Sequence, residues 1–102
     1  MEISTTATSD GVFRLLVAGE IDMATADDLE AALTQAITAA GTTTVIADLA
    51  QLTFCDSSGI AAFDKAYRQA TDRGVTFQVR NLQTGVRRVL EITGVLDRLL
   101  GN

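Results

Sequence analysis

The stretch TVIADLAQLTFCDSSGI, residues 44–60, decides the fold because it joins a strand to a helix through one short polar junction. Its first residues, 44–49, are mostly apolar and partly β-branched, which is typical of a strand covered on both faces. The junction contains Asp56, Ser57 and Ser58, and such residues begin helices by accepting hydrogen bonds from free backbone N–H groups. The stretch therefore predicts a buried strand that leads into a helix.

The residues on either side of this stretch predict further strands and helices. Apolar residues at a period of two indicate strands, and apolar residues at helical spacing with a glycine behind them indicate helices. Strands are expected at 2–7, 12–17 and 75–79, with a turn at 9–11 between the first two. Helices are expected from after Thr25 to before Gly41, over 58–73 and over 84–93, whereas 95–100 is too short to assign. Thr25 and Asp28 form a capping-box pattern at the start of the first helix.

The order of these elements predicts an α/β fold. Strands joined by helices favour parallel pairing, whereas the hairpin at the start adds an antiparallel strand. We therefore expect a mixed sheet of four or five strands with the helices packed mainly on one side. A chain of 102 residues suffices for one small domain, so residues 1–102 are expected to fold as a single unit.

The lack of histidine and the single Cys55 exclude several classes of enzyme and metal protein. Without histidine there is no Ser-His-Asp or Cys-His catalysis and no imidazole ligand for a transition metal. One cysteine forms neither an internal disulfide nor a thiolate zinc cluster. Asp56 and Ser57 make a poor base and nucleophile, because adjacent side chains at a helix start diverge. We expect no catalytic residue, no metal and no cofactor.

Charge and hydropathy limit the classes of partner. The formal net charge is −5, which disfavours non-specific binding to DNA or to an anionic membrane. No apolar run approaches the ~20 residues of a membrane-spanning helix, and no secretory signal is visible at the N-terminus. The chain is therefore expected in the cytoplasm, without direct contact to nucleic acid.

The polar junction contains more capping groups than one helix needs. Asp56, Ser57 and Ser58 compete for essentially one cap position, so at least one hydroxyl is left over at the helix N-terminus. Ser58 is expected in the first turn, and Asp56 and Ser57 in the loop before it. A phosphate is tolerated at such a position, because the helix dipole and the free N–H groups favour negative charge. The junction thus predicts a switch that changes binding rather than folding.

Three motifs occur in order along the chain: Gly19-Glu20-Ile21-Asp22, the stretch from Asp48-Leu49 to Asp56-Ser57-Ser58-Gly59-Ile60, and Arg87–Val95. Together they resemble the signature of the STAS domain, and more narrowly that of bacterial anti-sigma factor antagonists. The resemblance covers about residues 10–100. Cys55 departs from it, since a larger apolar residue is common there. A small buried thiol is one interpretation of Cys55 and a redox sensor is the other, although nothing nearby favours a low thiol pKa.

The resemblance implies which residues act. Ser57 matches the phosphorylated serine of the family. Residues expected at the partner-binding surface are Asp22, Thr25, Asp56, Ser58 and Gly59, and Asp56 is also expected to present the hydroxyl of Ser57.

The resemblance also implies a partner-switching function. The unmodified chain would bind an anti-sigma factor with serine kinase activity and so release a sigma factor. Phosphorylation of Ser57 would end binding, and a serine phosphatase would restore it. ATP and magnesium would belong to the kinase, so the chain itself is not expected to be an enzyme. One alternative is a STAS docking subunit of a stress-signalling or lipid-transport complex, and another is a ligand-binding STAS domain, both without a phosphorylation cycle.

Overall fold

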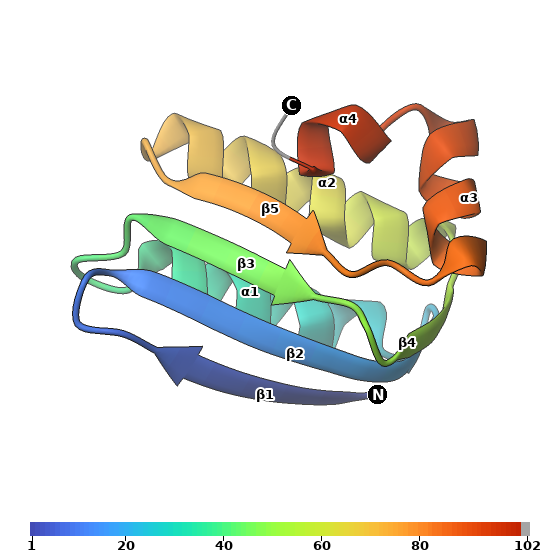
Figure 1. The fold of residues 1–102 in the computed structure, drawn as a ribbon, viewed down its shortest axis with the longest axis horizontal. Coiled ribbons are helices and arrows are strands. Elements are labelled where there is room, and N and C mark those ends of the chain that lie inside the picture. Colours follow the sequence, from blue (N-terminus) through green and yellow to red (C-terminus); the bar gives the residue numbers. More distant parts are fainter. Residues whose placement is uncertain (101–102) are drawn as a thin grey trace.

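The computed structural model describes residues 1–100, which form a mixed five-stranded sheet and four helices (Figure 1). The strands are β1 (Glu2–Ala7), β2 (Val12–Ile21), β3 (Thr44–Asp48), β4 (Leu52–Cys55) and β5 (Thr76–Arg80). The helices are α1 (Ala26–Thr38), α2 (Ser57–Asp72), α3 (Thr84–Thr93) and α4 (Leu96–Leu99). The predicted α/β fold with a mixed sheet is confirmed. Residues 101–102, which the expected single unit includes, lie outside the described residues.

The long strand β2 organises the sheet. The strand order of the sheet is β1-β2-β3-β5, with β1 antiparallel to β2 and the other pairs parallel. Residues 12–16 of β2 pair with β3, whereas Gly19–Ile21 pair with β4, with a shift in register between Gly19 and Glu20. The sequence expectation ended this strand at residue 17 and missed β4. A four-residue strand whose two end residues alone are buried has no clean period of two, so only its pairing with β2 reveals it.

The core lies between one face of the sheet and the helices α1 and α2, which both lie behind the sheet in Figure 1. The inward residues of the strands are almost fully buried: Leu15, Val17, Val45, Ala47, Phe77 and Val79. The expectation that 44–49 is covered on both faces was wrong, because only alternate residues of β3 are buried. Ile46 points to the other face, in register with Arg14 and Gln78, and remains half-buried there.

The helix ends differ slightly from the expected ones. α1 stops at Thr38 rather than just before Gly41, and α2 spans 57–72 rather than 58–73. α3 has the expected bounds, and Gly94 follows it with a positive φ of 79°. The tail contains the short helix α4, whose Leu96 and Leu99 are buried. α4 depends on this packing, since one turn is not stable by itself.

The turn between β1 and β2 requires a glycine, as the sequence indicated. Gly11 has φ +86°, and a Cβ there would lie 2.4 Å from the carbonyl oxygen of Gly41. The carbonyl of Gly11 also accepts a hydrogen bond from the backbone N–H of Thr43 at 2.9 Å. This turn therefore fixes the start of β2 against the start of β3.

Replacing Gly11 tests how much this close approach contributes to stability. Gly11→Ala combines backbone strain with a collision, so the free energy of unfolding should fall by about 2–4 kcal/mol in urea titration. Gly41→Ala is the control, because Gly41 has φ +81° and open space around its Cβ position. Gly41→Ala should lower the free energy of unfolding by backbone strain alone, about 1 kcal/mol. Equal losses for the two variants would show that the collision contributes nothing.

Candidate functional site

The junction between β4 and α2 is capped by Asp56. Its Oδ1 accepts hydrogen bonds from the backbone N–H of Ser58 at 2.9 Å and of Gly59 at 3.4 Å. The hydroxyl of Ser58 donates to the same oxygen. This hydroxyl, aided by the two backbone donors and opposed by desolvation, holds the pKa of the Asp56 carboxyl below its ordinary value. Asp56 is thus ionised at neutral pH and binds the first turn of α2.

Ser57 remains outside this cap. It is the first residue of α2 and is exposed to solvent, whereas Ser58 is half-buried. The expectation that Ser57 lies in the preceding loop was wrong by one residue, because Asp56 alone takes the cap position and the helix begins directly after it. The junction therefore has one hydroxyl engaged by the cap and one, on Ser57, that faces water.

The loop after β2 lies beside this junction. Ile21, the last residue of β2, is in register with Cys55, and its carbonyl accepts a hydrogen bond from the N–H of Asp56 at 3.2 Å. Asp22 directly follows Ile21, and Ser57 follows Cys55 by two residues. The chain thus brings the loop from Asp22 to Thr25 next to the start of α2.

Asp22 and Thr25 hold the loop in shape through each other. Asp22 Oδ1 accepts hydrogen bonds from the N–H of Ala24 at 3.0 Å and from the hydroxyl of Thr25 at 3.3 Å. Thr25 Oγ1 in turn accepts from the N–H of Asp22 at 3.0 Å. Thr25 occupies the cap position of α1 but makes no side-chain cap bond. The expected capping box is therefore wrong, because the hydroxyl of Thr25 is used by the preceding loop.

Gly59 and Cys55 lie beneath the junction rather than on its surface. Both are buried, and Cys55 is only 4% exposed. Burial, followed by the nearby charge of Asp56, raises the pKa of the Cys55 thiol to about 11. The thiol is therefore protonated at neutral pH and packs as a small apolar group, which fits the structural interpretation of Cys55.

Two exposed apolar residues at this end of the molecule were not among the expected partner-binding residues. Met23 is 84% exposed in the loop after β2, and Phe54 is 49% exposed on β4. Phe54 is in register with Glu20, and it lines a small hollow with Val86 and Val89 of α3. The available signal for Met23 was an apolar methionine in an otherwise polar turn. No local signal marks Phe54, because its exposure depends on how β4 pairs.

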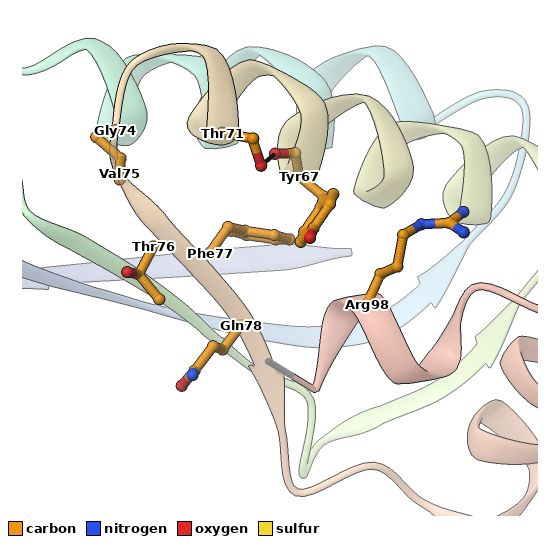
Figure 2. Close-up of a pocket in the computed structure, with 8 residues that line it drawn as sticks. All are labelled: Tyr67, Thr71, Gly74, Val75, Thr76, Phe77, Gln78 and Arg98. Carbon is orange, nitrogen blue, oxygen red and sulfur yellow. Dashed lines mark hydrogen bonds between the residues drawn. The ribbon is translucent and has the colours of Figure 1, made fainter. Parts of the chain in front are cut away.

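The hollow between α2, β5 and α4 is separate from this junction (Figure 2). It has a volume of about 320 Å³ and is lined by Tyr67, Thr71, Phe77, Gln78 and Arg98, among others. The Arg98 guanidinium is already paired with Asp64 at 3.0 Å, and the Thr71 hydroxyl donates to the Tyr67 carbonyl at 2.9 Å. The hollow therefore offers no unpaired charge to a ligand.

A bilayer-crossing segment is not among the elements of residues 1–100, since none of their helices combines the necessary length and apolar character.

The chain matches known proteins over nearly its whole length. The model of the STAS domain family matches residues 4–100. The anti-sigma-B factor antagonist of Staphylococcus aureus is 27% identical over 92 residues, which are 90% of this chain and 84% of the relative.

Solved structures agree with these matches. A structure of an anti-sigma factor antagonist from Mycobacterium paratuberculosis is 30% identical with a TM-score of 0.72, covering 92% of this chain and 80% of that one. The unphosphorylated anti-sigma factor antagonist SpoIIAA has a TM-score of 0.82 at 22% identity, covering 94% of this chain and 84% of that one. The phosphorylated form of SpoIIAA, from Bacillus, has a TM-score of 0.76 at 21% identity, covering 97% of this chain and 88% of that one. The chain therefore belongs to the STAS domain family, and the proteins it is similar to include anti-sigma factor antagonists.

Proposed function

We propose that this protein is an anti-sigma factor antagonist whose binding is switched by phosphorylation of Ser57. The unmodified protein binds an anti-sigma factor with serine kinase activity, which frees a sigma factor. The kinase then phosphorylates Ser57 and the complex dissociates, and a serine phosphatase restores the binding form. The observation that carries this proposal is the exposed hydroxyl of Ser57 beside a cap formed by Asp56, Ser58 and Gly59.

The cap distinguishes the two adjacent serines. The hydroxyl of Ser58 donates to Asp56 and is half-buried, so a kinase would have to break that bond and open the first turn. The hydroxyl of Ser57 requires neither change. Ser57 is therefore the phosphorylation target, and Asp56 and Ser58 hold the helix start in the shape in which Ser57 is presented.

A phosphate on Ser57 changes the contact surface without unfolding the helix. It adds about −1.5 to −2 charges at neutral pH, which the positive end of the helix dipole accommodates. In a complex the same charge would have to lose water against the partner, close to the carboxylates of Asp22 and Asp56. Phosphorylation thus weakens binding and leaves the fold intact.

The surface that contacts the partner combines charge with apolar area. Asp22 and Thr25 shape the loop beside Ser57, and Met23 and Phe54 supply exposed apolar side chains on the two adjoining segments. Burial of such side chains at the centre of a contact provides most of the binding free energy in many complexes. The protein contributes this surface and the hydroxyl, whereas ATP and magnesium enter with the kinase. In this proposal the protein has a regulatory role in the cytoplasm rather than a catalytic one, and it uses no cofactor of its own.

Variants of the two serines test the switch. Ser57→Ala should bind the kinase partner but gain no phosphate in an intact-mass measurement after incubation with ATP. Ser58→Ala is the matched control and should still gain one phosphate, because its Ser57 remains exposed. The phosphorylated parent should bind more weakly than the unmodified one by about 2–5 kcal/mol, which is more than tenfold in affinity.

Two results would contradict the switch. Phosphate found on Ser58 in the parent protein would assign the wrong serine. Equal affinity of the phosphorylated and unmodified forms would favour the docking-subunit alternative instead. Circular dichroism should be the same for both forms, so that a loss of binding is not a loss of folding.

Asp22 tests the contribution of charge alone. Asp22→Asn keeps the Oδ1 acceptor for Ala24 and Thr25 and removes only the negative charge. Association with the kinase partner should slow about twofold or more at low salt, and the difference should vanish as salt screens the charge. Asp72→Asn, an exposed acid at the other end of α2, should change nothing. Association rates of Asp22→Asn that match the parent at every salt concentration would remove Asp22 from the contact.

Met23 and Phe54 test the apolar part of the contact. Each alanine variant should weaken binding by about 1–3 kcal/mol, mainly through faster dissociation, in surface plasmon resonance. Ile92→Ala is the control, since Ile92 is 78% exposed on α3 and outside both segments. If Ile92→Ala weakened binding as much as the other two variants, the contact would be centred on α3.

A further inference from the structure

We infer that Gly59 is a positioning residue, whose missing side chain lets α2 approach β2 closely enough to hold Ser57 and the Asp22 loop in one fixed surface. This inference rests on the proposed function, because it concerns how the same site is presented to the kinase. Gly59 is buried and acts from beneath this surface.

The space beside Gly59 is too small for a side chain. A Cβ at this position would lie 2.5 Å from Cys55 Sγ and 2.7 Å from Ile21 Cγ2, closer than Cβ atoms approach their neighbours in folded proteins. Ile21 is fully buried and Cys55 is 4% exposed, so neither side chain can turn outward into solvent to make room. A methyl group at position 59 would therefore push the start of α2 away from β2.

The same contact joins the two halves of the proposed surface. Ile21 directly precedes Asp22, and its carbonyl accepts the hydrogen bond from the N–H of Asp56. Gly59 follows Ser57 by two residues and packs on the side chain of Ile21. A shift of α2 therefore moves Ser57 relative to the Asp22 loop.

Backbone conformation does not explain the glycine. The φ of Gly59 is not positive, and glycine is the poorest helix former after proline, so alanine would be preferred if only the helix mattered. The close approach of Ile21 and Cys55 is the feature that requires it.

Gly59→Ala tests the inference, with Gly85→Ala as the matched control. Both glycines lie in the first turn of a helix, but the Cβ position at Gly85 has nothing within 4 Å. Gly59→Ala should lower kcat/KM for phosphorylation by the kinase partner about tenfold or more, since small misplacements of a reacting group have effects of this size. It should also weaken binding of the unmodified protein, and it should shift the amide NMR signals of residues 22–25 and 56–58. Gly85→Ala should match the parent in phosphorylation and in the amide signals of residues 22–25 and 56–58.

A compensating variant covers the case in which Gly59→Ala fails to fold. Cys55→Ala removes Sγ, the atom nearest to the new methyl group, so the double variant Cys55→Ala/Gly59→Ala relieves the closest collision while Ile21 stays in the core. The double variant should be phosphorylated better than Gly59→Ala, or should fold where Gly59→Ala does not, so that the two substitutions are clearly non-additive.

Two results would overturn the positioning role. One is a Gly59→Ala variant that behaves like Gly85→Ala. The other is strict additivity of the two substitutions. If the parent were not phosphorylated on Ser57, the proposed function would fail, and the amide signals of residues 22–25 would still decide whether Gly59 positions the loop.

Discussion

The pairing of β4 with the end of β2 is the constraint on which the candidate site of this protein depends. Ile21 and Cys55 lie in register, and the N–H of Asp56 donates to the carbonyl of Ile21. This pairing leaves β2 with two parallel neighbours, β3 along its first half and β4 at its end. As a result, the loop after β2 and the start of α2 leave the sheet side by side, as one surface rather than two separate loops.

Neighbouring residues of the junction differ in their roles, since two of them stabilise the helix start and the third carries the proposed modification. Asp56 and Ser58 satisfy the first turn of α2, and Ser57 is left exposed. Because the pKa of Asp56 is lowered, its contribution to stability is present above the ordinary carboxyl pKa and is lost as the pH falls through the lowered value. At neutral pH the cap is therefore fully charged, so the proposed modification of Ser57 would change the surface while the support beneath it stays in place.

Local patterns predicted most of the fold and the capped helix start that carries the candidate site. Helical spacing of apolar residues gave α1, α2 and α3 to within a few residues, and the turn at Gly11 is where the sequence placed it. The motif around Ser57 was visible because capping residues and their excess are local features. β4 was missed because its two inward residues are buried only through its partner strand, and the exposed Phe54 was missed with it.

The sequence by itself determined the order of the strands and helices other than β4 and α4, the absence of histidine chemistry, and a helix start with more capping groups than it needs. Only the tertiary structure decided which of the three polar residues caps α2, because the choice depends on where β4 ends against β2. It also decided that β3 is covered on one face alone and that Gly59 lies under the site. These features arise from contacts between segments far apart in the chain, and such contacts leave no local pattern in the residues that make them.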